Sequence, residues 1–241
     1  DPDLPWHLDQ AEAVLRAGAW RYLDDTSFTL PAAEYVNHPW LGGLLLWGLY
    51  RVLGWSGPVL LAAACAALST LLAGLLARRA AEGRPWLAVT VAALVAGATS
   101  WRFEPRPHSL SLVFLPLAML LAERFARADA RREVAARAAM LMLLGLVWAQ
   151  LHPSYVILSP LVAIALLGQV RAVGLADYRR LALPLILMGL VLVAPGGIAY
   201  FAWLAEIGLG DATSFIAEMK PLTLRDLLPA GLDTALWLDA L

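Results

Sequence analysis

The chain has 241 residues, 61% of them hydrophobic and 15% charged, and its mean hydropathy is +0.69. These values exclude an ordinary soluble domain, and the net charge of -1 gives no electrostatic reason to expect a nucleic-acid partner. Several apolar runs approach the roughly 20 residues that a helix needs to cross a bilayer. We therefore expect an all-α, polytopic transmembrane helical bundle.

Residues 1–37 form the most polar long stretch of the chain. Residues 8–19 have the pattern of an amphipathic helix that ends near Gly18. Residues 40–53 are apolar but short, which predicts a re-entrant or interfacial helix, or one arm of a helical hairpin. The chain starts without a methionine or a signal segment. We interpret it as an excerpt of a longer protein that lacks its first membrane helix and its C-terminal region.

About six spanning helices follow, and the charges in the connections between them indicate how the chain is oriented in the membrane. The spans are predicted at about 58–77, 86–101, 109–123, 135–151, 155–170 and 181–200. Alternate connections hold eleven of the 18 Lys and Arg residues: Arg78, Arg79, Arg84, Arg124, Arg127, Arg131, Arg132, Arg137, Arg171, Arg179 and Arg180. The positive-inside rule places these connections in the cytoplasm.

The remaining connections are then expected to face outward. They are residues 1–57, 102–108, 152–154 and about 201–225, and all four histidines lie in or beside them: His7, His38, His108 and His152. We expect one membrane-embedded domain over residues 1–241. It consists of an outward loop (1–57), a transmembrane bundle (58–200), and an outward segment with the start of the next helix (201–241).

An acidic cluster opens the chain. Asp1 and Asp3 lie two residues apart in a proline-stiffened segment, and His7 follows. Two such carboxylates can share a divalent cation, or one can act as a general base beside the other. The alternative is a solvated loop just outside a membrane helix.

A basic cluster occupies the short outward loop 102–108. Arg102, Arg106 and His108 are unexpected there under the positive-inside rule, and arginine's planar fork suits phosphate recognition. The alternative is that Glu104 simply pairs with one of the arginines at the level of the lipid headgroups.

The other polar residues at segment ends are weaker candidates. A lone interfacial histidine such as His38 or His152 is usually structural, and Glu218 is adjacent to Lys220. The sequence has no Walker loop, GxSxG, HExxH or paired CxxC motif, which excludes a nucleotide-driven pump domain from it.

The order of these motifs resembles bacterial multi-spanning proteins of the type C glycosyltransferase superfamily. The resemblance covers about residues 1–221. Its elements are Asp1-Pro2-Asp3 with Trp6-His7, Asn37-His38-Pro39-Trp40-Leu41, Arg106-Pro107-His108-Ser109, Trp148-Ala149-Gln150-Leu151-His152 and Glu218-Met219-Lys220-Pro221. The chain departs from the family at two of these positions. Pro39 stands where relatives carry an acidic residue, and Met219 replaces a tryptophan.

The resemblance implies a hexosyl- or pentosyltransferase in the bacterial inner membrane with its active face outward. It would take a sugar from a polyprenyl-phosphate donor to an acceptor that is a glycan, a lipid or a protein. It implies Asp1 and Asp3 as the catalytic base or as ligands of Mg²⁺ or Mn²⁺, with His7 a further ligand. The remaining expected site residues are Arg102, Arg106 and His108 at the donor phosphate, and His7, His38, Glu104, His152 and Glu218 around the pocket.

Two other functions are compatible with the sequence. A transporter or flippase for a lipid-linked sugar or similar anion would use the basic cluster for binding without chemistry. A non-catalytic relative would keep the fold as an assembly subunit. The transporter predicts polar groups in mid-bilayer or broken helices in matching halves, and the sequence offers little of either.

Overall fold

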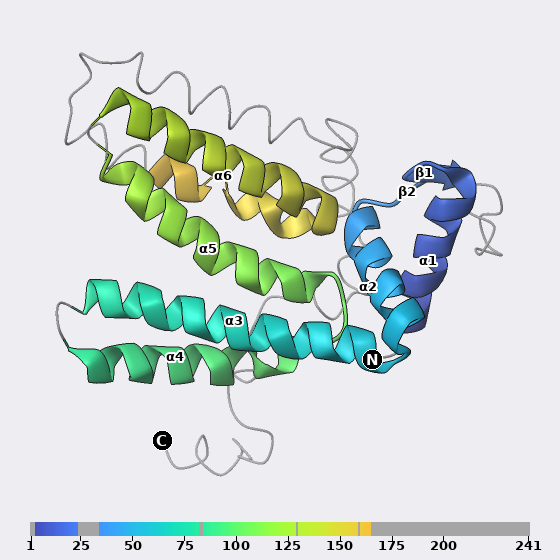
Figure 1. The fold of residues 1–241 in the computed structure, drawn as a ribbon, viewed down its shortest axis with the longest axis horizontal. Coiled ribbons are helices and arrows are strands. Elements are labelled where there is room, and N and C mark those ends of the chain that lie inside the picture. Colours follow the sequence, from blue (N-terminus) through green and yellow to red (C-terminus); the bar gives the residue numbers. More distant parts are fainter. Residues whose placement is uncertain (1–2, 24–33, 82–83, 129, 159, 165–241) are drawn as a thin grey trace, which may run out of the picture. The chain divides into compact units, whose positions relative to one another are not determined.

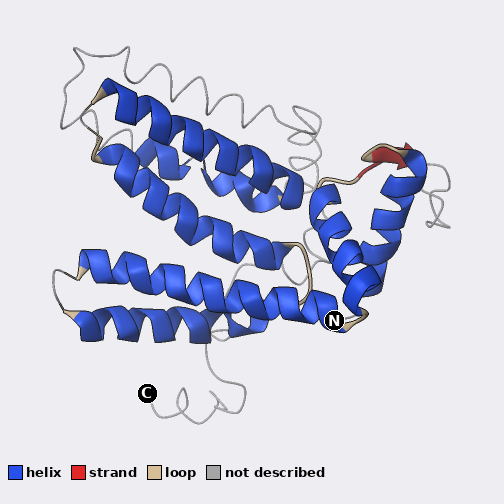
Figure 2. Ribbon diagram, in the orientation of Figure 1, coloured by secondary structure: helices blue, strands red, loops and turns tan. Residues whose placement is uncertain are grey.

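A computed structural model describes residues 3–23, 34–81, 84–128, 130–158 and 160–164 (Figure 1). The chain divides into two compact units, Asp1–Gly197 and Ile198–Leu241, and all described residues belong to the first. The described part is mostly helical, as expected (Figure 2). Its elements in order are α1 (Leu4–Ala17), β1 (Arg21–Leu23), β2 (Glu34–Val36), α2 (Trp40–Leu53), α3 (Ser56–Ala80), α4 (Pro85–Thr99), η1 (Ser100–Arg102), α5 (His108–Ala126), α6 (Arg131–Leu151) and η2 (Pro153–Ile157).

Helix α1 is the amphipathic helix predicted over residues 8–19, but it begins four residues earlier. Pro5 lies in its first turn, where a missing backbone N–H costs nothing. Leu4, Leu8 and Val14 lie on its buried face. The helix ends at Gly18, which adopts a left-handed conformation with φ +63°.

A two-stranded antiparallel ribbon between α1 and α2 corrects the expectation of an all-α chain. Strand β1 pairs with β2 so that Tyr22 lies opposite Tyr35, with ring centroids 5.5 Å apart. Such cross-strand aromatic pairs stabilise short ribbons. Strands of three residues are too short to show a twofold hydrophobic period, and for that reason the sequence did not predict them.

Three helices are long and apolar enough to cross a membrane. They are Ser56–Ala80, His108–Ala126 and Arg132–Leu151, and they match the predictions at 58–77, 109–123 and 135–151. Helix α4 is apolar, but its 15 residues extend only about 22 Å at 1.5 Å per residue. The stretch Pro153–Ile164 reaches the limit of the described chain, and residues 181–200 lie outside it. The count of six spans therefore stays a prediction.

The bundle has an arginine-rich end and a histidine-rich end. Helices α3 and α4 form a hairpin, and α5 packs against α3 and α6 (Figure 1). At the arginine-rich end, Arg79 Nη1 lies 3.5 Å from Glu123 Oε2, which joins the C-terminal turns of α3 and α5. Two of the arginine-rich connections thus lie together. The third, at 171–180, lies outside the described residues.

At the other end, helix α2 packs closely against the start of α5 and the end of α6. A Cβ added at Gly42 would lie 2.7 Å from the Leu151 carbonyl oxygen and 2.9 Å from Pro107 Cβ. No larger residue fits there without movement of backbone. A hydrogen bond of 2.7 Å from Trp40 Nε1 to Gln150 Oε1 joins α2 and α6 as well. These contacts place α2 beside the segments that carry His108 and His152.

Candidate functional site

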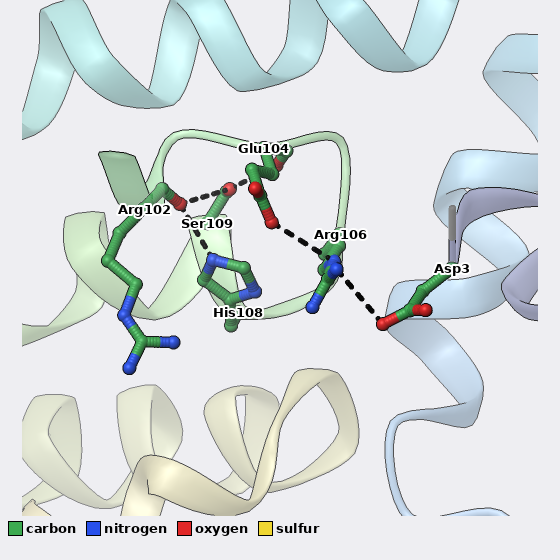
Figure 3. A network of polar contacts seen from close by, with 6 residues as sticks. All are labelled: Asp3, Arg102, Glu104, Arg106, His108 and Ser109. Carbon is green, nitrogen blue, oxygen red and sulfur yellow. Dashed lines mark hydrogen bonds and ion pairs between the residues drawn. The ribbon is translucent and has the colours of Figure 1, made fainter. Parts of the chain in front are cut away.

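The loop that connects η1 to α5 is fixed by its own hydrogen bonds. The Arg106 backbone N–H donates to the Glu104 carbonyl at 2.7 Å. The buried Ser109 hydroxyl donates to the Glu104 carbonyl as well, and it lies 3.3 Å from the Arg102 carbonyl (Figure 3). Pro107 is fully buried. The loop therefore presents its charged side chains from a defined backbone.

Arg106 bridges two carboxylates that come from different parts of the chain. Its Nη2 lies 3.0 Å from Asp3 Oδ2, at the start of α1, and its Nε lies 3.1 Å from Glu104 Oε2. The Arg106 side chain is 15% exposed, whereas those of Asp3 and Glu104 are 51% and 42% exposed. The structure thus brings Asp3 to the basic loop (Figure 3). It also contains the pairing of Glu104 with an arginine that the sequence left as the alternative.

The rings of His108 and His152 lie close together in an edge-to-face arrangement, with centroids 6.3 Å apart. His108 Nε2 is 2.6 Å from the Arg102 carbonyl oxygen, which only accepts hydrogen bonds, so Nε2 carries the proton. His152 Nδ1 accepts from the Ser154 backbone N–H at 3.2 Å, so this nitrogen carries none.

A buried chain of hydrogen bonds supports His152. Trp148 is fully buried, and its Nε1 donates to the Ser111 hydroxyl at 2.9 Å. Ser111 and Ser154 hydroxyls are 2.7 Å apart, and Ser154 Oγ lies 2.9 Å from His152 Nδ1. Together these bonds join α5, α6 and the turn after α6. The orientation of the His152 ring is therefore set by groups on three segments.

All four histidines influence the charge of this region. Burial, with smaller contributions from His108, His7 and His38, lowers the pKa of His152 to about 3. Burial also lowers the pKa of His7 to about 4, against an opposing effect of Asp3, and lowers that of His38 to about 4. His7, His38 and His152 are therefore neutral at pH 7.

The metal ligands expected from the sequence lie only partly within the described residues. No group of three His, Cys, Asp or Glu side chains among them is close enough to hold a cation. Asp3, one of the cation ligands expected from the sequence, is paired with Arg106. Asp1 and Glu218 lie outside the described residues.

The sequence missed the hydroxyl and indole groups that position the histidines. Ser109 and Trp148 belong to two of the motifs and Ser111 and Ser154 lie close to them, but the sequence analysis predicts no role for any of the four side chains. Ser109 and Ser111 follow His108 in the first turn of α5, before a long apolar stretch of the helix. The placement of these two serines at alternate positions of a buried helical turn is the sequence signal that could have identified them.

Comparison with known proteins gives no relative. No protein-family model, curated protein or solved structure matches the chain. The arrangement of Asp3, Arg102, Arg106, His108 and His152 therefore has to be interpreted from its own chemistry.

Proposed function

We propose that the chain is the membrane-embedded part of a glycosyltransferase that transfers a sugar from a polyprenyl-phosphate donor to an acceptor. The observation that carries the proposal is the 3.0 Å contact between Asp3 Oδ2 and Arg106 Nη2. It means that a carboxylate able to act as a base and a loop able to bind phosphate lie at one site. The resemblance to the type C glycosyltransferase superfamily rests on the same residues.

In this reaction Asp3 accepts the proton of the acceptor hydroxyl as that oxygen attacks the anomeric carbon. The negative charge of the departing lipid phosphate is stabilised by Arg102 and Arg106. Because Arg106 is paired with Asp3 and Glu104, the donor phosphate competes with both carboxylates for the guanidinium. Binding of the donor thereby releases Asp3 to act as a base.

The bundle also offers a place for a lipid chain. An apolar groove of about 530 Å³ lies between α3, α4 and α5, and Thr99 is among its lining residues, three positions before Arg102. Large apolar side chains such as Val59 and Leu71 on α3 are more than half exposed, which suits a helix in contact with lipid. Both features support a donor whose phosphate is attached to a long hydrocarbon.

The proposed location is the bacterial inner membrane, with the histidine-rich end facing outward. The contact between Arg79 and Glu123 supports this orientation, because it gathers the first two arginine-rich connections at the opposite end. The positive-inside rule assigns such an end to the cytoplasm.

The test is sugar transfer by the purified full-length protein in lipid nanodiscs, with prenyl-phosphate sugars as donors. Asp3→Asn and Asp1→Asn are compared with Asp9→Asn, which changes an exposed carboxylate elsewhere on α1. We expect Asp3→Asn to lower turnover by about 100-fold or more, the usual contribution of a general base. Asp9→Asn should transfer normally. Normal turnover in both the Asp1 and Asp3 variants would reject the assignment of the base.

A second function is favoured by one observation, the double pairing of Arg106. A guanidinium neutralised by Asp3 and Glu104 is also what a purely structural link between α1 and the 102–108 loop requires. In that case the chain is a transporter, or a non-catalytic relative, that binds a lipid-linked anion without chemistry. Donor binding by the wild-type protein with no transfer to any acceptor would favour this function.

A further inference from the structure

His108 and His152 each have one ring nitrogen that is hydrogen-bonded to the protein and one that makes no such bond in the described part of the chain. His108 commits Nε2–H to the Arg102 carbonyl, so its remaining nitrogen, Nδ1, is a hydrogen-bond acceptor. His152 commits Nδ1 to the Ser154 backbone N–H, so its remaining nitrogen, Nε2–H, is a donor. Within the described part of the chain, neither remaining nitrogen has a hydrogen-bond partner.

The two rings are too far apart for a direct hydrogen bond between them. A direct bond between the two rings would bring their centroids to within about 5.1 Å, since an N–H···N contact is about 2.9 Å long and each nitrogen lies about 1.1 Å from its centroid. The centroids are 6.3 Å apart. An oxygen atom that bonds both nitrogens separates them by about 4.5–5.6 Å, which the observed spacing accommodates.

The chemistry of the pair selects the kind of oxygen. A phosphate oxygen without a proton accepts from His152 Nε2–H, but it cannot donate to His108 Nδ1. A carbonyl oxygen has the same limitation. A hydroxyl does both, because it has one O–H and two lone pairs. His108 is therefore better suited to a hydroxyl than to the phosphate that the sequence assigned to it.

We propose that His108 and His152 form a hydroxyl-recognition pair, in which one sugar hydroxyl of the lipid-linked donor donates to His108 Nδ1 and accepts from His152 Nε2–H. This inference rests on the proposed function, because it deepens the description of the donor. The phosphate is then left to Arg102 and Arg106. Figure 3 shows the Arg102 and Arg106 side chains on opposite sides of His108, so the hydroxyl site lies among the phosphate-binding groups.

The bridge requires neutral rings, and the surroundings of His152 keep its ring neutral. Burial is the main cause that holds the pKa of His152 at about 3, and the titratable groups that face it from neighbouring segments are His7, His38, His108 and Arg102. Each of these groups disfavours a second proton on His152. His152 thus keeps Nε2–H as a donor across the physiological pH range.

Asparagine and glutamine substitutions separate recognition from structure, because each mimics a different ring nitrogen. Glutamine places its amide near Nε2, and asparagine places its amide near Nδ1. His108→Gln keeps the bond to the Arg102 carbonyl but removes the acceptor, whereas His108→Asn keeps an acceptor and loses that bond. His152→Asn keeps the contact with Ser154 but removes the donor, whereas His152→Gln keeps a donor.

The experiment measures binding of two probes by the full chain in nanodiscs. One probe is a panel of prenyl phosphates that carry hexoses or pentoses, and the other is prenyl monophosphate without sugar. We expect His108→Gln and His152→Asn to weaken binding of the preferred sugar-bearing probe about tenfold, the loss expected for one hydrogen bond in a desolvated site. His108→Asn and His152→Gln, which keep the acceptor and the donor respectively, should weaken binding less than the first two variants. The sugar-free probe should bind all four variants equally.

The outcomes are distinguishable. A purely structural role predicts the reverse order, with His108→Gln and His152→Asn the milder changes, and that order overturns the pair. Equal losses for the sugar-free probe also overturn it, because they assign the histidines to the phosphate. If the wild-type protein binds no sugar-bearing probe better than prenyl monophosphate and transfers none, the proposed function fails, and the pair fails with it.

Discussion

Substitution of Gly42 by alanine tests whether the close packing of α2 holds the site together. The added Cβ would lie 2.7 Å from the Leu151 carbonyl oxygen and 2.9 Å from Pro107 Cβ, and both belong to segments next to the central histidines. Backbone atoms cannot rotate away as a side chain does, so α2 has to move. Overpacking of this kind typically costs about 1–3 kcal/mol.

Gly48→Ala is the matched control, because it makes the same chemical change in the same helix. A Cβ at Gly48 meets no other described atom within 4 Å. Alanine is favoured over glycine in a helix by up to about 1 kcal/mol, and both variants receive this gain. The difference in unfolding free energy between the two variants therefore isolates the clash, and we expect it to be about 1–3 kcal/mol.

The assay is the apparent thermal midpoint of both variants in the same detergent. One kcal/mol shifts the midpoint by about 2–4 °C in a chain of this size, so Gly42→Ala should melt about 2–12 °C below Gly48→Ala. Binding of sugar-bearing prenyl phosphate should fall in Gly42→Ala only, because the added methyl group pushes Pro107 and Leu151 apart. Equal midpoints and equal binding would show that α2 does not set the spacing of the site.

Two further predictions concern the buried polar groups. Trp148→Phe removes the N–H that reaches the Ser111 hydroxyl and leaves a small cavity, so unfolding experiments in denaturant should show a loss of about 1–3 kcal/mol; an unchanged midpoint would contradict the hydrogen bond. The second prediction follows from the pKa values of about 4 for His7 and His38 and about 3 for His152, all below the ordinary value of 6.5. Below about pH 6.5 these histidines are protonated in the unfolded chain but stay neutral in the folded chain. The free energy of unfolding is therefore retained above about pH 6.5 and falls as the pH is lowered from there towards 4. The thermal midpoint should follow this course and fall less steeply in His152→Gln, and a wild-type midpoint that does not fall below pH 6.5 would refute it.

The parts of the fold that the sequence predicted well depend on long hydrophobic patterns. The segments that became α3, α5 and α6 were found because runs of about 20 apolar residues have few alternatives. Gly18 correctly marked the end of α1, since a left-handed residue there favours glycine. The ribbon at Tyr22 and Tyr35 was missed because three-residue strands leave no period to detect.

The candidate site was predictable only in part, because its key contacts join residues far apart in sequence. Topology alone indicated that Asp3 and the 102–108 loop face the same side, and the two do meet. Topology could not show that Arg106 binds both carboxylates, because that depends on side-chain directions across two segments. Nor could it show which nitrogen of His108 is committed, since the partner is a backbone carbonyl.

Charge balance among the described groups explains why this end of the bundle tolerates several titratable residues. The cations Arg102 and Arg106 are matched by the anions Asp3 and Glu104, and the buried histidines outside the spans are neutral at pH 7. Arrival of a donor phosphate upsets this balance by adding negative charge. In the proposed reaction the half-exposed carboxylate of Asp3 leaves Arg106 and remains solvated, because an exposed anion keeps most of its hydration. Under the proposed function, the pairing that makes Arg106 look structural in the free protein is compatible with a role in catalysis, because a phosphate bound by Arg106 would free Asp3 to act as the base.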